Sequence, residues 1–147
     1  MSDLTKLIAP SFYGVHHDIK AGRHTHYWLK GGRGSTKSSF ISVEIILGMM
    51  QDAAANALVL RKVAVNLKDS VYEQLLWAIE ALGVENLWQA KLSPLQLSYL
   101  PTGQRILFRG ADEPKKIKST KFRKGYCKYI WYEDCLLYTS DAADDRI

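Results

Sequence analysis

Residues 31–39 read G-G-R-G-S-T-K-S-S, and this glycine-rich stretch joins an apolar segment to a segment with helical periodicity. Residues 24–29 alternate loosely between polar and apolar side chains and predict a strand, whereas residues 38–50 carry apolar side chains at helical spacing. A glycine-rich turn between a strand and a helix, ending in Lys-Ser, is a recurrent way of holding nucleotide phosphates. The stretch therefore restricts the chain to folds in which a strand runs through a tight loop into a helix.

The same stretch predicts a phosphate-binding loop. Glycine lets backbone N–H groups approach an anion, Lys37 can reach the outer phosphates, and the Ser38 hydroxyl can ligate Mg²⁺. Thr36 occupies the position where the common motif has its second glycine, so either the strained residue is Gly34 or this is an ordinary basic surface loop. The nucleotide-binding residues predicted here are Gly31, Gly32, Arg33, Gly34, Ser35, Thr36, Lys37, Ser38 and Ser39.

Further strands and helices alternate along the chain. Residues 1–22 are mixed and predict a leading strand or an arm. The later predicted elements are a buried strand over 57–63, a helix over 67–82 ended by Gly83, a hairpin over 96–100 and 104–109, and an apolar strand over 129–132. This order predicts an α/β fold with a mainly parallel sheet, helices on both faces and an inserted β-hairpin.

Two acids, Glu133 and Asp134, directly follow the last apolar strand. Nucleotide hydrolysis needs one acid to hold Mg²⁺ and another group to orient the attacking water, and adjacent carboxylates at a strand end can supply both. Arg33 could neutralise charge on the transferred phosphoryl group, or it could pair with a surface acid. Arg61, near the end of the second predicted strand, could approach the nucleotide or couple to the next helix.

The 20 basic residues outnumber the 15 acidic ones, which gives a net charge of +5. A solvated surface or a phosphate-rich partner would each account for this excess. Two cysteines and the lack of a leader or a long apolar run predict a protein that is neither secreted nor inserted in a membrane. The basic residues concentrate in one segment, predicted to contact DNA or a neighbouring subunit, which contains Lys115, Lys116, Lys118, Lys121, Arg123, Lys124 and Lys128.

Several motifs occur in a fixed order between Tyr13 and Asp134. They are G-G-R-G-S-T-K-S-S-F, V-L-R-K-V, S-V-Y-E-Q-L-L-W, P-T-G-Q-R-I-L-F-R-G-A-D, K-K-I-K-S and Y-I-W-Y-E-D. Together they resemble the large terminase subunit of tailed phages, in the subgroup typified by defective Bacillus prophages. In that family, threonine at the position of Thr36 is a known variant.

The resemblance implies a P-loop ATPase in the cytoplasm of a bacterial host, which uses ATP and Mg²⁺ to drive double-stranded DNA into a procapsid. It also implies a small terminase subunit and a portal protein as partners, a homo-oligomeric ring, and a nuclease domain that follows the ATPase domain. By motif, Lys37 and Ser38 correspond to the phosphate and Mg²⁺ ligands and Glu133 to the metal-side acid. Asp134 corresponds to the catalytic carboxylate and Arg33 to the arginine at the γ-phosphate.

The chain departs from the family pattern at its end. The family has two glutamates after the apolar strand, whereas the second acid here is Asp134. Residues 135–147 resemble the translation of a sequencing adapter, so we expect residues 1–134 to be the N-terminal part of the ATPase domain and 135–147 to be a non-native tail. Such an incomplete domain is expected to be inactive alone. Two alternatives remain open at this point: a helicase-like P-loop ATPase, and a non-enzymatic basic DNA-binding module.

Overall fold

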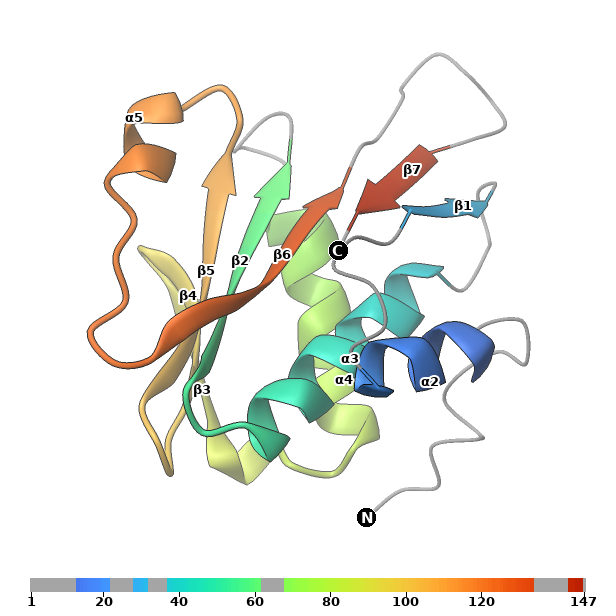
Figure 1. Ribbon diagram of the computed structural model, residues 1–147. Helices are drawn as coiled ribbons and strands as arrows, with labels where there is room; N and C mark the ends of the chain where they lie inside the picture. Colours follow the sequence, from blue (N-terminus) through green and yellow to red (C-terminus); the bar gives the residue numbers. More distant parts are fainter. Residues whose placement is uncertain (1–12, 22–27, 32–36, 62–67, 134–142, 147) are drawn as a thin grey trace.

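A computed structural model describes residues 13–21, 28–31, 37–61, 68–133 and 143–146 (Figure 1). The first half contains α2 (Tyr13–Ala21), β1 (Trp28–Gly31), α3 (Lys37–Gln51), β2 (Ala55–Arg61), the π-helical turn η3 (Lys68–Tyr72) and α4 (Glu73–Ala81). The second half contains the 3₁₀ turn η4 (Glu85–Leu87), β3 (Trp88–Leu92), β4 (Leu95–Tyr99), β5 (Gln104–Gly110), α5 (Pro114–Lys118), β6 (Tyr126–Glu133) and β7 (Ala143–Arg146).

The strands form one seven-stranded sheet in the order β1-β7-β6-β2-β5-β4-β3. The predicted α/β class is confirmed, but the prediction of a mainly parallel sheet is wrong. Among the described strands, β2 alone forms parallel pairs, with β5 on one side and β6 on the other, and the remaining four pairings are antiparallel. The sheet is mixed because the β3–β4 hairpin extends one edge and β7 inserts between β1 and β6.

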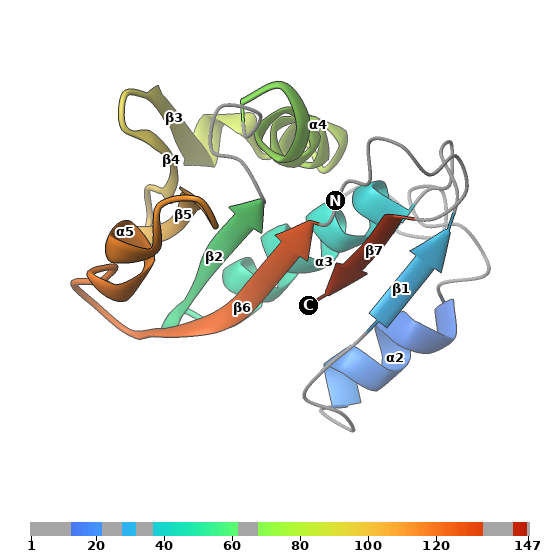
Figure 2. The same cartoon turned by 90° about the horizontal axis from the view of Figure 1, so that it is seen from above.

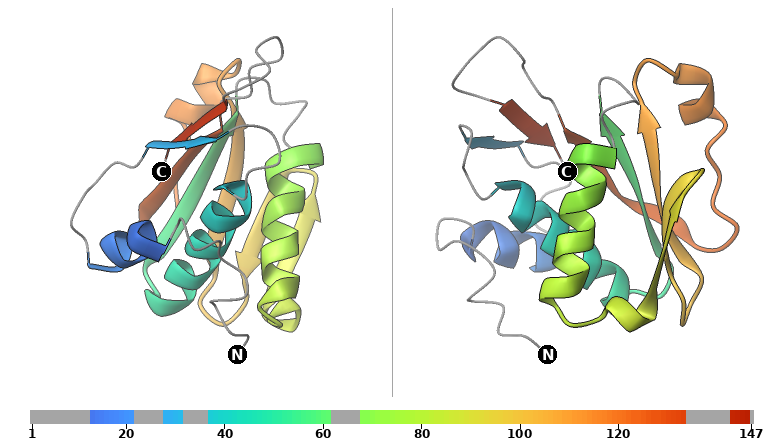
Figure 3. Two further views of the ribbon diagram at one scale, coloured as in Figure 1. Left: turned by 90° about the vertical axis from the view of Figure 1, so that its right-hand side faces the viewer. Right: turned by 180° about the vertical axis from the view of Figure 1, so that it is seen from behind.

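The two faces of the sheet are covered differently. Helices α3 and α4 lie against one face, and the short helix α5 lies on the other side (Figures 2 and 3). Trp131 points to the α3 face and is fully buried, while the next residue back, Ile130, faces the other way and is 49% exposed. The core therefore lies between the central strands and α3 and α4.

Helix α3 is the most buried helix of the fold. It was predicted over 38–50 and forms over Lys37–Gln51, with side chains from Phe40 to Met49 packed in the core. Glu44 lies in the middle of this helix, and its carboxyl group is hydrogen-bonded to His16 Nδ1 of α2. The prediction of a strand or arm before residue 22 is wrong for residues 13–21, where Val15 and Ile19 pack one helical face of α2 against the core.

The other predicted elements occur with shifted ends. The hairpin forms as β4 and β5, but β3 was not predicted and extends it into a three-stranded antiparallel unit. The helix predicted over 67–82 is a π-helical turn followed by α4, and Gly83, with a φ of +70°, follows it as expected. Strand β7 lies inside residues 135–147, and the prediction that this segment is non-native stays a prediction.

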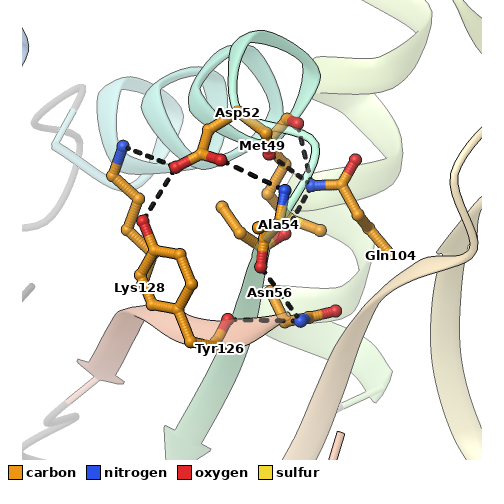
Figure 4. Close-up of polar contacts among 8 residues, drawn as sticks. Met49, Asp52, Ala54, Asn56, Gln104, Tyr126 and Lys128 are labelled. Atoms are coloured by element: carbon orange, nitrogen blue, oxygen red, sulfur yellow. Dashed lines mark hydrogen bonds and ion pairs between the residues drawn. The ribbon is translucent and has the colours of Figure 1, made fainter. Parts of the chain in front are cut away.

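Buried amide side chains tie together the amino ends of β2, β5 and β6 (Figure 4). The Gln104 amide donates to the backbone carbonyls of Met49, Asp52 and Ala55, which fixes β5 to the turn between α3 and β2. Asn56 Nδ2 donates to the carbonyls of Lys124 at 2.8 Å and Tyr126 at 3.2 Å, and its Oδ1 accepts from the Arg105 N–H at 2.9 Å. We call Asn56 and Gln104 the amide clamp.

Gly125 lets the chain pass close to this clamp. It adopts a φ of +75°, and a Cβ atom there would lie 2.0 Å from the carbonyl oxygen of Ala54. The same carbonyl accepts a 2.9 Å hydrogen bond from the Tyr126 N–H. Only glycine combines this backbone conformation with so close an approach.

Among the described residues, no helix has both the length and the apolar character needed to cross a membrane.

Candidate functional site

The start of α3 lies at the same end of the sheet as the ends of β2 and β6. Helix α3 ends at Gln51, and a short turn reverses the chain into β2, so the two elements run in opposite directions (Figure 1). Their lengths match, because 15 helical residues and seven strand residues each span about 20 Å. Arg61 is paired in register with Glu133, which brings the ends of both strands level. We call this edge the carboxyl end of the sheet.

Arg61 and Glu133 also share a face. Strand alternation places both on the side of the sheet that α3 covers, together with Val59 and Trp131. Arg61 Nη2 lies 4.0 Å from Glu133 Oε1, and the two side chains are only 13% and 16% exposed. A guanidinium and a carboxylate therefore lie beside each other at the edge where α3 begins.

Arg61 connects three elements at this end. Its Nη1 donates a 2.8 Å hydrogen bond to Ser70 Oγ in η3, and its carbonyl accepts a 2.7 Å bond from the Ala111 N–H. The contact with Ser70 provides the coupling to the next helical segment that the sequence suggested. The alternative role of Arg61, direct contact with a nucleotide, stays a prediction.

The first turns of α3 carry three serines with distinct contacts. The Ser38 carbonyl accepts a 2.8 Å hydrogen bond from Ser42 Oγ, one turn later. Ser39 Oγ donates to Gln74 Oε1 of α4 at 3.5 Å. The sequence did not identify Gln74, although it lies within the stretch S-V-Y-E-Q-L-L-W that contributed to the family resemblance.

Part of the predicted site lies outside the described residues. Gly31 is the last residue of β1 and Lys37 the first of α3, as the loop prediction requires, and the Lys37 side chain is outside the described part of the structure. The roles assigned to these residues and to Glu133 therefore stay predictions. The predicted site residues that lie outside the described residues are Gly32, Arg33, Gly34, Ser35, Thr36 and Asp134.

The oxygen donors predicted at the carboxyl end are of the kind that Mg²⁺ takes when it binds together with a phosphate group. Mg²⁺ favours oxygen ligands and takes only one or two from the protein when phosphates supply the rest. The Ser38 hydroxyl and the Glu133 carboxylate are the oxygens predicted for this role. Within the described residues no group of three or more His, Cys, Asp or Glu side chains could hold a metal by itself.

Three of the shifted pKa values belong to groups that contact α2 or the turn after α3. Burial raises the pKa of Glu44, although the hydrogen bond from His16 partly opposes this effect. Burial also raises the pKa of Tyr129 to about 12. The hydrogen bond from the Tyr126 hydroxyl, together with the Ala54 N–H, lowers the pKa of Asp52. These groups contact α2 and the turn after α3, so their shifts reflect packing contacts there.

The basic segment extends over both ends of the sheet. Its first three lysines lie on α5, near the carboxyl end, and the chain then runs toward the start of β6 (Figure 1). Lys116 pairs with Glu113 at 3.2 Å and Lys128 with Asp52 at 3.4 Å. Near the start of β6 the segment borders a groove of about 370 Å³, lined by Lys91, Gln96, Gly103, Arg105, Arg123 and Lys124. The sequence did not identify Lys91 or Arg105, because they lie far from the basic run.

Comparison with known proteins gives consistent matches. The family described as phage terminase large subunit matches residues 23–144. The chain is 44% identical over 131 residues to the terminase large subunit of Bacillus phage SPP1, which covers 89% of this chain and 31% of that protein. It is 36% identical over 111 residues to the PBSX phage terminase large subunit of Bacillus subtilis strain 168, which covers 76% of this chain and 24% of that protein. The chain thus spans about a third or less of the length of these curated relatives.

Proposed function

The chain belongs to the phage terminase large subunit family, and we propose that it forms part of an ATPase that drives double-stranded DNA into a procapsid. One observation carries the catalytic part of this proposal. The start of α3, the Glu133 carboxylate and the Arg61 guanidinium lie at one edge and on one face of the sheet. A nucleotide phosphate bound there would meet a helix N-terminus and an acid suited to Mg²⁺ at the same time.

In the proposed mechanism, Lys37 and the loop amides neutralise the charge that develops on the γ-phosphate during attack by water. Ser38 and Glu133 would hold Mg²⁺, and the ion when bound would supply positive charge beside the phosphate groups. Asp134 orients the attacking water, and Arg33 stabilises the transferred phosphoryl group. The contact of Arg61 with Ser70 would carry movement at this edge to η3 and α4.

Family membership also supports a proposal about partners. We propose that the complete protein acts on double-stranded DNA in the host cytoplasm as a ring of identical subunits. It would work with a small terminase subunit and a portal protein, and it would carry a nuclease beyond this segment. The family assignment favours packaging over the helicase-like alternative.

A lysine substitution tests the catalytic proposal. In a protein of full family length that carries this segment, Lys37→Ala is expected to reduce ATP hydrolysis by a hundredfold or more, on the order of the loss seen when one charge-stabilising donor is removed. Lys20→Ala on α2, an exposed lysine away from this edge, is the matched control and should leave turnover unchanged. The measurements are steady-state phosphate release and circular dichroism of each variant.

Two results would contradict the proposal. Undiminished turnover in Lys37→Ala would show that the glycine loop does not bind the reacting phosphate. Salt-sensitive DNA binding without any binding of Mg-ATP would instead support the non-enzymatic DNA-binding module.

A further inference from the structure

We propose that the groove beside the start of β6 binds the phosphate backbone of double-stranded DNA. We call it the basic groove and define it by Lys91, Arg105, Arg123 and Lys124, with Gln96 and Gly103 completing its lining. The choice of DNA as the ligand rests on the proposed function. The location of the site rests on the contacts described below.

The antiparallel strands bring Lys91 and Arg105 to one face. Lys91 is paired with Gln96, and Ser98 is paired with Arg105, so these four side chains project from the same side of the sheet. Gln96 Nε2 donates a 3.0 Å hydrogen bond to Ser98 Oγ, which links the two cross-strand pairs. The unpredicted strand β3 therefore supplies one cation of the groove, and β5 supplies another.

One buried side chain fixes the distance between the backbone segments that carry two of the cations. Asn56 is only 2% exposed, and it accepts from the Arg105 N–H while donating to the Lys124 carbonyl. Arg105 Nη2 also donates to the Lys121 carbonyl at 3.3 Å, across the basic segment. The backbones that carry Arg105 and Lys124 are thus fixed relative to each other. Asn56 acts as a positioning residue for the groove.

No neighbour that the structure describes neutralises the positive charges of the groove. Lys116 and Lys128, elsewhere in the basic segment, each pair with an acid, but none of the four groove cations forms an ion pair with a described residue. The described lining also includes no Asp or Glu. Cations held close together repel one another, and a phosphate between them relieves that repulsion. A concave surface with four such cations suits successive phosphates of a nucleic-acid backbone.

The basic groove is separated from the candidate nucleotide site. Arg105 shares its face with Leu107 and Leu58, whereas Arg61 and Glu133 point to the face that α3 covers. The groove also lies near the amino ends of the strands, and β2 spans about 20 Å from there to Arg61. DNA phosphates in the groove would therefore not compete with the phosphates of ATP.

Charge reversal tests this location. The full 147-residue chain is titrated with a fluorescent 30-base-pair duplex at several salt concentrations, as wild type and as the double variant Lys91→Glu/Lys124→Glu. We expect the variant to bind about tenfold more weakly at moderate salt and to lose about two units of the slope of log affinity against log salt. Thermal unfolding and Mg-ATP binding of both proteins are measured in parallel and should agree.

The matched control is Lys115→Glu/Lys118→Glu on α5, which changes the net charge equally but lies outside the groove. It should weaken DNA binding much less. An equal loss in the control, or unchanged DNA binding in the groove variant, would overturn the proposal, as would tighter binding of a double-stranded RNA of the same sequence. If the wild-type chain binds DNA through the groove but does not bind Mg-ATP, the groove stands and the nucleotide part of the proposed function fails.

Discussion

The two ends of the parallel strands are built from different chemistry. At the amino end, Asn56 and Gln104 are neutral, at least 96% buried, and hydrogen-bonded to backbone groups of neighbouring elements. At the carboxyl end, Arg61 and Glu133 are charged, and the distance between them is 4.0 Å, at the outer limit for an ion pair. The amino end holds the sheet together, while the carboxyl end presents charge at the edge where α3 begins.

Because of this difference, the residues that stabilise the sheet and the residues suited to catalysis lie at opposite ends of the same strands. A buried amide that satisfies backbone groups stabilises a fold without offering a reactive group, and its loss leaves polar atoms without partners. For a mostly buried charged pair, the cost of removing both groups from water offsets much of their attraction, so the pair adds little net stability, but it can rearrange around a ligand. We therefore expect substitutions at the amino end to affect unfolding most strongly, and those at the carboxyl end to affect catalysis.

The largest effect on stability is expected at Gly125. Gly125→Ala should lower the free energy of unfolding by about 3 kcal/mol, because a left-handed alanine costs one to two kcal/mol and the added Cβ also meets the Ala54 carbonyl. Gly103→Ala is the control, since Gly103 has a similar φ of +78° but open space around it, and it should cost only about 1 kcal/mol. Urea unfolding measures the free energy of unfolding of both variants. Equal losses would show that the close approach to Ala54 contributes nothing.

A smaller loss is expected when half of the amide clamp is removed. Gln104→Ala should lower the free energy of unfolding by about 2 kcal/mol, because three backbone carbonyls lose their shared donor in a buried setting. Gln89→Ala, at an exposed position of β3, should change it by less than about 0.5 kcal/mol. If Gln104→Ala were as mild as this control, the amino end would not be the stabilising end.

Sequence patterns predicted an element correctly where one physical cause determines its structure. Helix α3 was predicted within one residue at each end, because a long apolar face at helical spacing has few other interpretations. Strand β3 was missed because only Trp88 of its five residues is buried, so it lacks the alternation of a half-buried strand. The mixed sheet was missed because β7 lies in the tail that was expected to be non-native, and pairing partners cannot be read from composition.

The candidate sites were also predicted only in part, because sequence patterns show contiguous residues and not those brought together by folding. The order of strand, glycine-rich stretch and helix, and the acid at the end of β6, were visible because each is contiguous in the sequence. The basic groove was only half visible, since Lys91 and Arg105 join Arg123 and Lys124 through strand pairing and through Asn56. Amide side chains such as Asn56 and Gln104 have no motif of their own. Their importance appears only when the backbone groups around them are known.

The smallest expected effect is a change with pH in the stability that Asp52 contributes at the amino end. Asp52, in the turn before β2, accepts hydrogen bonds from the Tyr126 hydroxyl at 2.8 Å and the Ala54 N–H at 3.1 Å, and its pKa in the folded protein is lowered from 3.8. A carboxyl with a lowered folded pKa stabilises the fold above its unfolded pKa and loses that contribution as the pH falls through the folded value. The stability difference between wild type and Asp52→Asn should therefore be constant from about pH 5 to 7 and shrink below about pH 4.

Two further variants identify the cause of this pH dependence. The Tyr126 hydroxyl is the largest influence on the pKa of Asp52 and Lys128 a smaller one, so Tyr126→Phe should remove more of the pH-dependent difference than Lys128→Ala. Urea unfolding at a series of pH values measures both. A larger effect from Lys128→Ala would mean that charge pairing, rather than neutral hydrogen bonding, holds the amino end. That result would remove the contrast with the Arg61–Glu133 pair, because both ends would then depend on ion pairs.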